Sequence, residues 1–549
     1  MKCLRFFVLF ILLQQSAAAQ SWQDTVQSIN HLFNRYQPGH PGCQVAISRN
    51  GKVIFSKAWG MANMDNNIPY TTETVTEAGS ISKQFTAAAV LLLAQQGKLS
   101  LDDDLRKYFP EFPDYGKVIK LKYLLHHTSG IREWSNLEAI TGWPRTTKAY
   151  TNADVFATLC RQQKLNNVPG AEFIYSNSNY ILLALIVEKV SDMSLPDFTQ
   201  KYIFDPAGMT HTSWRDSYKK IVPNRGIAYS LKDGHYQINM PNESVYGPGG
   251  LLTTAEDLLK WAAFYLNNKL GNPGLLNQQL ATEKLADGTD NNYAAGLVIN
   301  EQKGLVSHNG QTAGYVGIVE NFTKQNISIT YLSNNTEFKE DLFGGANGIE
   351  KLFIKPAEAE IIPAKKAETA IALSPEKLQK YAGWYSIDKV NEGVEITLRH
   401  DTLLFRNNPM VPVSEHEFTF YKNAVIFGDD GRMLVTTGDK RKIQLKKEIT
   451  AKVTPAYLKA FAGTYYSKET ESSFTLLIKE GKLVLEKDNI KDAALIPTYR
   501  QAFNILLDLD GEIYPVGANL LFETNNKKEV MLCKVSMGNA RGMSFVKIK

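Results

Sequence analysis

Cysteine is scarce in this sequence. Four cysteines occur among 549 residues, at positions 3, 43, 160 and 533. Disulfide-stapled domains and cysteine metal sites keep their cysteines at short, regular spacings, so this sequence excludes both classes. At most one disulfide can form among Cys43, Cys160 and Cys533.

Blocks of like charge are missing as well. The chain has 61 Lys and Arg and 56 Asp and Glu residues, a formal net charge of +5, and the two signs are mixed along it. The sequence therefore carries no electrostatic footprint for a nucleic acid, and no nucleic-acid partner is expected. With 44% hydrophobic and 21% charged residues, the composition is that of a globular protein. Its length exceeds what one hydrophobic core supports, and we expect about two to four domains.

Long apolar runs are confined to the N-terminus. There, "MKCLRFFVLFILLQQSAAAQ" carries Lys2 and Arg5, then an apolar run, then three alanines. This order predicts a secretory signal peptide over residues 1–19, cut before Gln20. The run is too short to span a bilayer, and no later run is long enough. We therefore expect a protein secreted across the inner membrane, periplasmic or extracellular, with no membrane span after cleavage.

Two common catalytic motifs are also missing. The chain has no G-x-S-x-G, as in Ser-His-Asp hydrolases, and no H-E-x-x-H, as in zinc proteases. Nothing in the sequence requires a metal or another cofactor, and none is expected.

Residues 20–355 combine helical and strand patterns. Near the start, "CQVAISRNGKVIFSKAWGMAN" predicts two strands, and near the end "GYVGIVENFTKQNISITYLSNN" predicts two more. Helices are expected between them, among others over 81–96 and 179–191. Strands at both ends with helices between predict one α+β domain whose sheet is assembled from both ends.

The C-terminal third contains an internal repeat. "SPEKLQKYAGWY" (374–385) aligns with "TPAYLKAFAGTY" (454–465) at an offset of 80, and apolar residues then alternate at period two in both copies. We predict two small antiparallel β-barrel-like domains, over 373–450 and 451–549. Residues 356–372 are rich in alanine and charge without a core-facing period, and predict a linker.

Lys83 is unexpected in the apolar stretch "EAGSISKQFTAAAVLLLAQQGK". It follows Ser80 by one helical turn, on the same face. Burial moves the pKa of a lysine toward neutrality, and the neutral amine is a base that can activate a serine nucleophile. The free N–H groups of a helix N-terminus favour the negative charge that develops on attack. The pair therefore indicates nucleophilic catalysis.

The S-x-x-K pattern is weak by itself. It occurs five times, starting at Ser80, Ser217, Ser374, Ser386 and Ser544. The first copy is distinguished by two later motifs, a Y-x-N at Tyr175-Ser176-Asn177 and an H-x-G at His308-Asn309-Gly310. Each of these motifs is weak evidence by itself, because short patterns recur by chance. The three motifs in this order are much rarer than any one of them.

In this order the motifs resemble those of the penicillin-recognising serine hydrolases, which include class C β-lactamases, DD-peptidases, esterases and D-aminopeptidases. The segments "LLHHTSGI", "IFDPAGMTHTSW" and "YGPGGLLTTAEDLLKW" extend the resemblance over about residues 25–340. It implies an α+β fold, an antiparallel sheet flanked by helices plus an all-helical subdomain at about 105–245, within a hydrolase domain at 20–355. The cleft between sheet and subdomain would hold the site. The two C-terminal barrels resemble the D-aminopeptidase branch.

The resemblance implies a role for each motif residue. Ser80 is the expected nucleophile, and Lys83 and Tyr175 are the expected proton carriers, either of which can be the general base. Asn177 is expected to bind the acyl part of the substrate and to orient Lys83. The backbone N–H groups of Ser80 and Gln311 are the expected oxyanion donors, and one such donor contributes about 3 kcal/mol.

His308 and Gly310 complete the expected substrate-binding residues. The β-lactamases usually carry lysine where this chain has His308, and that permanent charge helps to hold a substrate carboxylate. A histidine is mostly neutral at pH 7, which favours an ester, an amide or a peptide bound by its amino end over a β-lactam. His126 and His127, within "LLHHTSGI", are expected to be structural.

We therefore expect an exported serine hydrolase that cleaves amide or ester bonds through a Ser80 acyl-enzyme. Its partner would be a small-molecule or peptide substrate: a D-amino-acid peptide, a peptidoglycan-type fragment, an ester or, less favourably, a β-lactam. D-aminopeptidase, DD-carboxypeptidase and esterase types stay open, as does the oligomeric state. The alternative is a non-catalytic penicillin-fold protein that binds or senses cell-wall fragments. The C-terminal domains would gate the cleft or dock the enzyme to a partner or glycan.

Overall fold

The computed structural model describes residues 22–337, 345–354 and 371–549, apart from short gaps at 144, 146, 388–389, 391, 439–441, 488–489, 506–507, 510–511 and 514–517. The predicted signal peptide, residues 1–19, lies outside the described residues, as do residues 356–370 of the predicted linker.

The central sheet of the hydrolase domain has six antiparallel strands in the order β12-β13-β14-β15-β1-β2. Their bounds are β1 Cys43–Arg49, β2 Lys52–Trp59, β12 Val298–Asn300, β13 Leu305–Thr312, β14 Tyr315–Phe322 and β15 Ile327–Ser333. Strand β1 pairs with β15, with Cys43 opposite Ser333. The first and last long strands of the domain therefore lie side by side, as the sequence predicts for this α+β fold.

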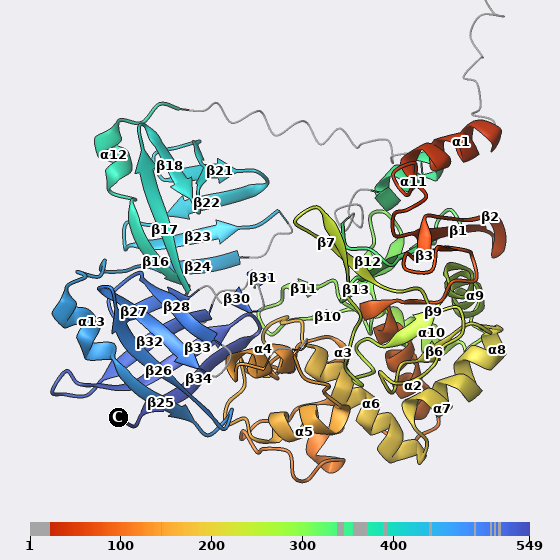
Figure 1. Cartoon of the computed structure of the whole chain (residues 1–549), viewed down its shortest axis with the longest axis horizontal. Helices are drawn as coiled ribbons and strands as arrows, with labels where there is room; N and C mark the ends of the chain where they lie inside the picture. The colour runs from red at the N-terminus through yellow and green to blue at the C-terminus, as the bar shows by residue number, and fades with distance from the viewer. Residues whose placement is uncertain are drawn as a thin grey trace, which may run out of the picture.

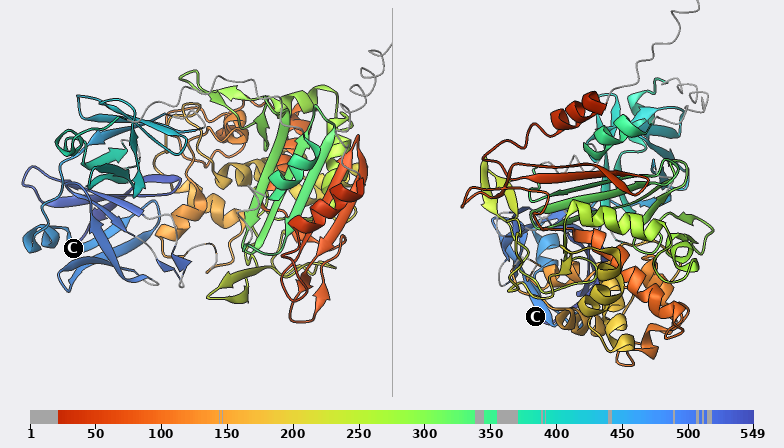
Figure 2. Two further views of the ribbon diagram at one scale, coloured as in Figure 1. Left: turned by 90° about the horizontal axis from the view of Figure 1, so that it is seen from above. Right: turned by 90° about the vertical axis from the view of Figure 1, so that its right-hand side faces the viewer.

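Helices cover both faces of this sheet (Figure 2). On one face, α1 (Trp22–Leu32) and α11 (Gly345–Phe353) share an apolar core with β14 and β15. On the other face, α9 (Ala255–Leu266) packs against β1 and β15. Because both faces are covered, every residue of β14 and β15 is buried, including the polar residues Ser328 and Thr330 of β15.

Glu320, on β14, is a carboxyl group buried in this double-sided core. Burial, reinforced by the nearby Glu350, raises the pKa of Glu320 from 4.5 to about 7. The folded state thus holds a proton that the unfolded chain releases. The contribution of this group to stability is complete below pH 4.5 and is lost as the pH rises through 7.

We expect Glu320→Gln to raise the free energy of unfolding at pH 8 by up to about 3 kcal/mol, at about 1.4 kcal/mol for each pKa unit. At pH 5 the difference should shrink to less than about 1 kcal/mol, because Glu320 is then neutral in the folded state and only partly ionised in the unfolded chain. Thermal unfolding at the two pH values measures the difference. An equal shift at pH 5 and pH 8 would contradict the assignment of a raised pKa.

The helical part of the domain is built around two buried helices in mutual contact, α2 (Lys83–Gln95) and α6 (Asn177–Ser191). The shorter helices are η1 Gly79–Ser82, η2 Leu105–Lys107, α3 Leu121–Leu125, α4 Trp134–Ile140, α5 Asn152–Cys160, α7 Leu195–Thr199, η3 Gln200–Phe204, α8 Asp205–Ala207 and α10 Gly274–Leu280. Short strands accompany them, namely β3 Met61–Asn63, β4 Ile68–Pro69, β5 Thr76–Glu77, β6 Ser213–Trp214, β7 Tyr229–Lys232, β8 His235–Ile238, β9 Leu251–Thr253, β10 Glu283–Lys284 and β11 Asp290–Asn291. The segment expected to be helical therefore also carries the hairpin β7–β8.

Two antiparallel β modules follow the hydrolase domain (Figure 1). The first is a nine-stranded sheet preceded by α12 (Pro375–Gln379), with strands β16 Gly383–Ile387, β17 Glu392–Arg399, β18 Thr402–Phe405, β19 Asn408–Pro409, β20 Val411–Pro412, β21 Glu417–Phe420, β22 Asn423–Phe427, β23 Arg432–Thr436 and β24 Lys442–Lys447. Its two edge strands, β19 and β20, are separated along the chain by Met410 alone. The edges of this sheet therefore come together, and the module is a nearly closed barrel.

The second module is a closed eight-stranded barrel preceded by α13 (Pro455–Phe461). Its strands are β25 Gly463–Ser467, β26 Ser472–Lys479, β27 Lys482–Lys487, β28 Ile490–Pro497, β29 Ala502–Ile505, β32 Ala518–Thr524, β33 Val530–Met537 and β34 Ala540–Lys547, and β30 Asp508–Leu509 and β31 Glu512–Ile513 form a separate pair. The two barrel-like modules agree with the fold class expected from the sequence repeat.

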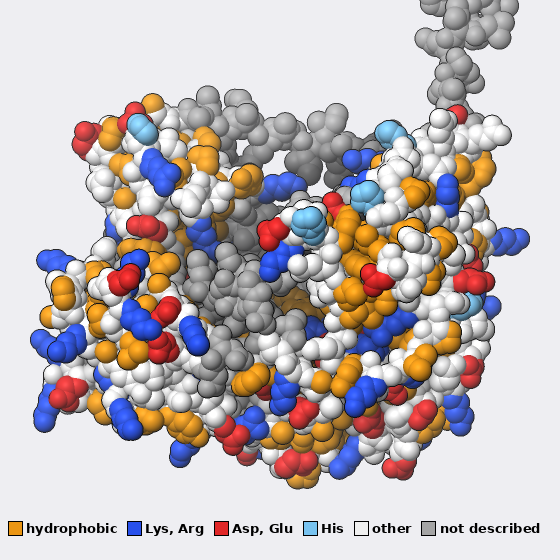
Figure 3. All heavy atoms as spheres, viewed as in Figure 1, with side chains coloured by type: hydrophobic (Ala, Val, Ile, Leu, Met, Phe, Trp, Pro, Cys, Tyr) orange, Lys and Arg blue, Asp and Glu red, His pale blue; other side chains and the backbone are white. Residues whose placement is uncertain are grey.

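The surface mixes both signs of charge. On the face seen in Figure 3, Lys and Arg side chains are interspersed with Asp and Glu over both halves of the molecule. Among the described residues, no helix is both long enough and apolar enough to cross a membrane.

Candidate active site

Ser80 lies in the single turn of η1, directly before α2. Gly79 there has a positive φ of 52°, and a Cβ on it would lie 2.6 Å from the backbone nitrogen of Gln311. A Cβ on Gly310 of β13 would lie 2.7 Å from the nitrogen of Ser80. Only glycine allows the two backbones to approach this closely. The approach brings the Ser80 and Gln311 nitrogens, the two expected oxyanion donors, into one region.

Three of the expected residues meet at the hydroxyl group of Ser80. Its Oγ lies 3.0 Å from Lys83 Nζ and 2.9 Å from the hydroxyl of Tyr175. Lys83 is completely buried, and its Nζ also donates to Asn177 Oδ1 and to the carbonyl of Pro248, each at 2.8 Å. Burial holds the pKa of Lys83 well below its usual value, although Glu133 opposes the shift. The environment of Lys83 therefore favours the neutral amine over the charged ammonium.

Glu133 orients the side chain of Asn177. Its carboxylate accepts from the backbone nitrogen of Asn177 at 2.5 Å and from Asn177 Nδ2 at 3.1 Å. With Nδ2 held by Glu133, Asn177 Oδ1 faces Lys83. Glu133 was not singled out by the sequence, because one acidic residue in the segment before α4 belongs to no recognisable motif.

The ring of His127 packs against the ring of Tyr175. The two rings lie 4.3 Å apart between centroids, and His127 Nδ1 accepts from the backbone nitrogen of Ser176 at 3.2 Å. Burial raises the pKa of Tyr175 above its usual value, so its phenol is neutral at pH 7. His126, by contrast, contacts the carbonyl of Tyr293 through Nδ1 at 3.0 Å.

His308 is buried, and both of its ring nitrogens face protein groups. Nε2 lies 3.0 Å from the hydroxyl of Tyr293, and Nδ1 lies 2.5 Å from the carbonyl of Asn309. Burial, followed by the charge of Lys83, lowers the pKa of His308 to about 3. The imidazole is thus neutral at pH 7, as expected. Substrate binding by His308 itself stays a prediction, and Tyr293, its partner, was missed from the sequence.

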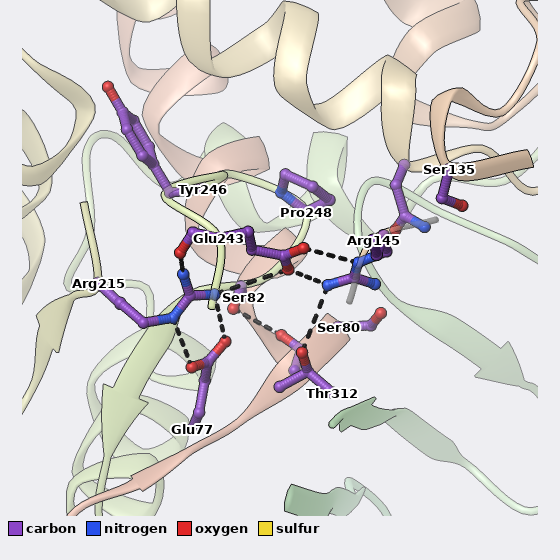
Figure 4. A network of polar contacts seen from close by, with 12 residues as sticks. Glu77, Ser80, Ser82, Ser135, Arg145, Arg215, Glu243, Tyr246, Pro248 and Thr312 are labelled. Atoms are coloured by element: carbon purple, nitrogen blue, oxygen red, sulfur yellow. Dashed lines mark hydrogen bonds and ion pairs between the residues drawn. The ribbon is translucent and has the colours of Figure 1, made fainter. Parts of the chain in front are cut away.

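A buried ion-pair network anchors the segment that leads into Ser80 (Figure 4). Arg215 donates to both carboxylate oxygens of Glu77, at 2.8 and 2.9 Å, and both side chains are only 1% exposed. Burial alone would raise the pKa of Glu77, but Arg215 outweighs it and holds the pKa below the usual value. Glu243 forms ion pairs with both Arg215 and Arg145. Arg145 Nη2 in turn lies 3.4 Å from Oγ1 of Thr312, at the end of β13. The partners are far apart in sequence, so no local pattern revealed the network.

We expect Arg215→Met to lower the free energy of unfolding by about 3–5 kcal/mol, because it leaves the carboxylate of Glu77 buried without its main partner. Chemical denaturation measures the loss. Lys220→Met is the matched control, since its ion pair with Asp216 is about 40% exposed on both sides and should contribute less than about 1 kcal/mol. Equal effects of the two substitutions would contradict an anchoring role for Arg215.

No cluster of three or more His, Cys, Asp or Glu side chains that could hold a metal ion occurs in the part of the chain that the structure describes. The polar groups around Ser80 are instead a lysine, a tyrosine, an amide and backbone N–H groups. This set can move protons to and from a serine hydroxyl and bind a developing oxyanion.

Comparison with known proteins supports a family assignment. Residues 18–350 match the family described as "Beta-lactamase". Protein flp of Staphylococcus aureus (strain N315) is 31% identical over 327 residues, which cover 57% of this chain and 64% of flp. Penicillin-binding protein 4* of Bacillus subtilis (strain 168) is 27% identical over 381 residues, or 65% of this chain and 82% of that protein. The chain thus spans less than two thirds of the length of flp.

A solved structure extends the likeness to the C-terminal modules. The octameric penicillin-binding protein homologue from Pyrococcus abyssi aligns with 96% of this chain and 99% of its own, with a TM-score of 0.51 and 19% sequence identity. At that identity the alignment shows a shared fold, and it includes both β modules.

Proposed function

The chain belongs to the beta-lactamase family, and on this basis we propose that it is a serine hydrolase that cleaves amide or ester bonds through an acyl-enzyme on Ser80. One observation carries the proposal. The hydroxyl oxygen of Ser80 lies within hydrogen-bond distance of both Lys83 Nζ and the Tyr175 hydroxyl, and the side chain of Lys83 is completely buried beside it.

The contacts of Lys83 suit a general base. A neutral amine has two N–H donors and one lone pair. The carbonyl oxygens of Asn177 and Pro248 accept the two donors. The lone pair is then left for the proton of Ser80, the third group in contact with Nζ. Burial favours this neutral form at pH 7.

The proposed reaction has two steps. In the first, Ser80 Oγ bonds to the substrate carbonyl carbon while its proton moves to Lys83, and the oxyanion is bound by the Ser80 and Gln311 N–H groups. The C–N or C–O bond then breaks, and the leaving group takes a proton through the neutral phenol of Tyr175. In the second, water attacks the acyl-enzyme, gives up a proton to the same groups, and releases the acid and Ser80.

The substrate class follows from the charges around the site. His308 is neutral, and Arg145 is paired with Glu243. This favours an ester, an amide or a D-amino-acid peptide over a β-lactam. We propose that Asn177, His308 and Gly310 bind the substrate, and that the enzyme acts after export, directed by residues 1–19. Its type would be D-aminopeptidase, DD-carboxypeptidase or esterase.

Hydrolysis of a matched panel tests the proposal. The panel consists of a p-nitrophenyl ester, D- and L-alanine p-nitroanilides, a D-Ala-D-Ala tripeptide and nitrocefin. Turnover of one class identifies the substrate class. No turnover, together with no labelling of Ser80 by a fluorophosphonate, would overturn the proposal and favour a protein that only binds.

A further inference from the structure

A hairpin of the C-terminal barrel reaches the catalytic region of the hydrolase domain. The turn between β33 and β34 contains Asn539, whose Nδ2 donates to the backbone carbonyl of Tyr175 at 2.7 Å. The carbonyl of Asn539 accepts from the backbone nitrogen of Glu133 at 3.0 Å and from Asn166 Nδ2 at 2.8 Å. Its backbone nitrogen donates to Asn136 Oδ1 at 2.9 Å. One residue of the barrel thus holds both Tyr175 and Glu133.

The barrel is fixed in this position by a buried ion pair. Arg132 Nη1 lies 2.7 Å from Glu469 Oε1, and the two side chains are 1% and 4% exposed. Glu469 Oε1 also accepts from the backbone nitrogen of Gln163 at 2.8 Å. Arg541 adds contacts to Asn166 Oδ1 at 2.9 Å and to Glu172 at 3.2 Å. In Figure 1, α4 accordingly lies against the ends of β33 and β34.

These contacts act on a segment without regular secondary structure, which the hydrolase domain holds by separate hydrogen bonds, such as that from the backbone nitrogen of Ile174 to the carbonyl of His127 at 2.9 Å. Between the end of α5 at Cys160 and the start of α6 at Asn177, no helix or strand occurs among the residues, all of which are described. The backbone that carries Tyr175 therefore lacks a ladder of regular hydrogen bonds. The barrel supplies hydrogen bonds at Gln162, Gln163, Asn166 and Tyr175.

We propose that Asn539 is a positioning residue, through which the C-terminal barrel holds Tyr175 and Glu133, and hence Asn177 and Lys83, in their reactive arrangement. The chain of contacts is continuous. Asn539 binds the backbone of Glu133, whose carboxylate binds Asn177, whose Oδ1 accepts from Lys83. This inference rests on the proposed function of Ser80. It makes the barrel a part of the active site and not a separable accessory.

Asn539→Ala in the full chain tests the inference. It removes the donor to the carbonyl of Tyr175 and leaves the backbone contacts in place. A displacement of about 1 Å at a catalytic group lowers rates about a hundredfold, so we expect the rate of Ser80 acylation by a fluorophosphonate to fall 10- to 100-fold. Rates are expressed per titrated active site. For the substrate that the panel identifies, kcat should fall while KM changes little.

Asn525→Ala is the matched control, because Asn525 lies in the turn at the opposite end of β33 and caps the nitrogens of Lys527 and Glu529. It should leave the acylation rate unchanged. Asn539→Asp is a second variant, of the same size, that replaces the donor with a negative charge at the backbone carbonyl of Tyr175. It should also move the acidic limb of the pH profile of acylation upward, which a merely structural role would not do.

The outcomes separate the two proposals. If the parent is labelled at Ser80 and Asn539→Ala acylates at the same rate, the inference is overturned and the proposed function stands. Equal slowing by Asn525→Ala would also overturn it, since the effect would then come from general weakening of the barrel. If the parent shows neither labelling nor turnover, the proposed function fails and this inference fails with it.

Discussion

Replacing Ser80 by alanine is expected to lower turnover about a millionfold, the size of loss that follows removal of the nucleophile in a serine hydrolase. The acyl-enzyme cannot form without the Oγ atom, and Lys83 then has no serine hydroxyl from which to take a proton. Turnover of the best panel substrate, and covalent labelling followed by intact-mass measurement, give the result. The fold should persist, because the substitution removes only the hydroxyl group and adds no atom that would need space.

Ser217→Ala is the control for this experiment. Ser217 has the same S-x-x-K spacing, to Lys220, but its hydroxyl accepts from the backbone nitrogen of Lys219 in a turn. It should leave turnover unchanged. Substantial turnover by the Ser80 variant would show that the bond is broken without an acyl-enzyme on this residue.

The second largest effect is expected from Lys83→Met, which should lower the acylation rate about 10²- to 10⁴-fold, the usual range for loss of a general base. Neutral Lys83 is the active form, so the rate of the parent should fall as the pH drops through the lowered pKa of Lys83. That acidic limb should be missing from the pH profile of the variant. Stability should change little, because the removal of a buried amine offsets the loss of its hydrogen bonds to Asn177 and Pro248.

Tyr175→Phe is the companion variant in these measurements, since it removes only the hydroxyl that contacts Ser80. If the lysine variant stays within tenfold of the parent while the phenylalanine variant loses the acidic limb, Tyr175 and not Lys83 is the base for acylation. Equal losses in both would indicate that the two groups move protons as one unit.

Much of the fold could be predicted from local patterns. At the repeat offset of 80, α12 corresponds to α13, and the hairpin β16–β17 corresponds to β25–β26. The structure has these elements at the corresponding positions. The corresponding turns at His400 and Glu480 both adopt positive φ, 52° and 50°. Such turns and alternating strands depend on neighbours within a few residues, and the sequence therefore reveals them.

Closure of the modules was less predictable. Both copies of the repeat alternate at period two, yet one forms an eight-stranded closed barrel and the other a nine-stranded sheet that nearly closes. Alternation specifies which side chains face inward, but not which strand completes the ring. That choice depends on pairing between strands far apart in the chain.

By itself, the sequence determined the α+β hydrolase domain, the two β modules, and the candidates Ser80, Lys83, Tyr175, Asn177, His308, Gly310 and Gln311, because motif spacing and period are properties of short segments. Only the tertiary structure decided that Glu133 orients Asn177, that the hydroxyl of Tyr293 contacts Nε2 of His308, and that Asn539 of the barrel donates to the carbonyl of Tyr175. These contacts join residues between 15 and 364 positions apart. A hydrogen bond needs atoms within about 3 Å, and only the packing of whole domains brings such distant residues that close.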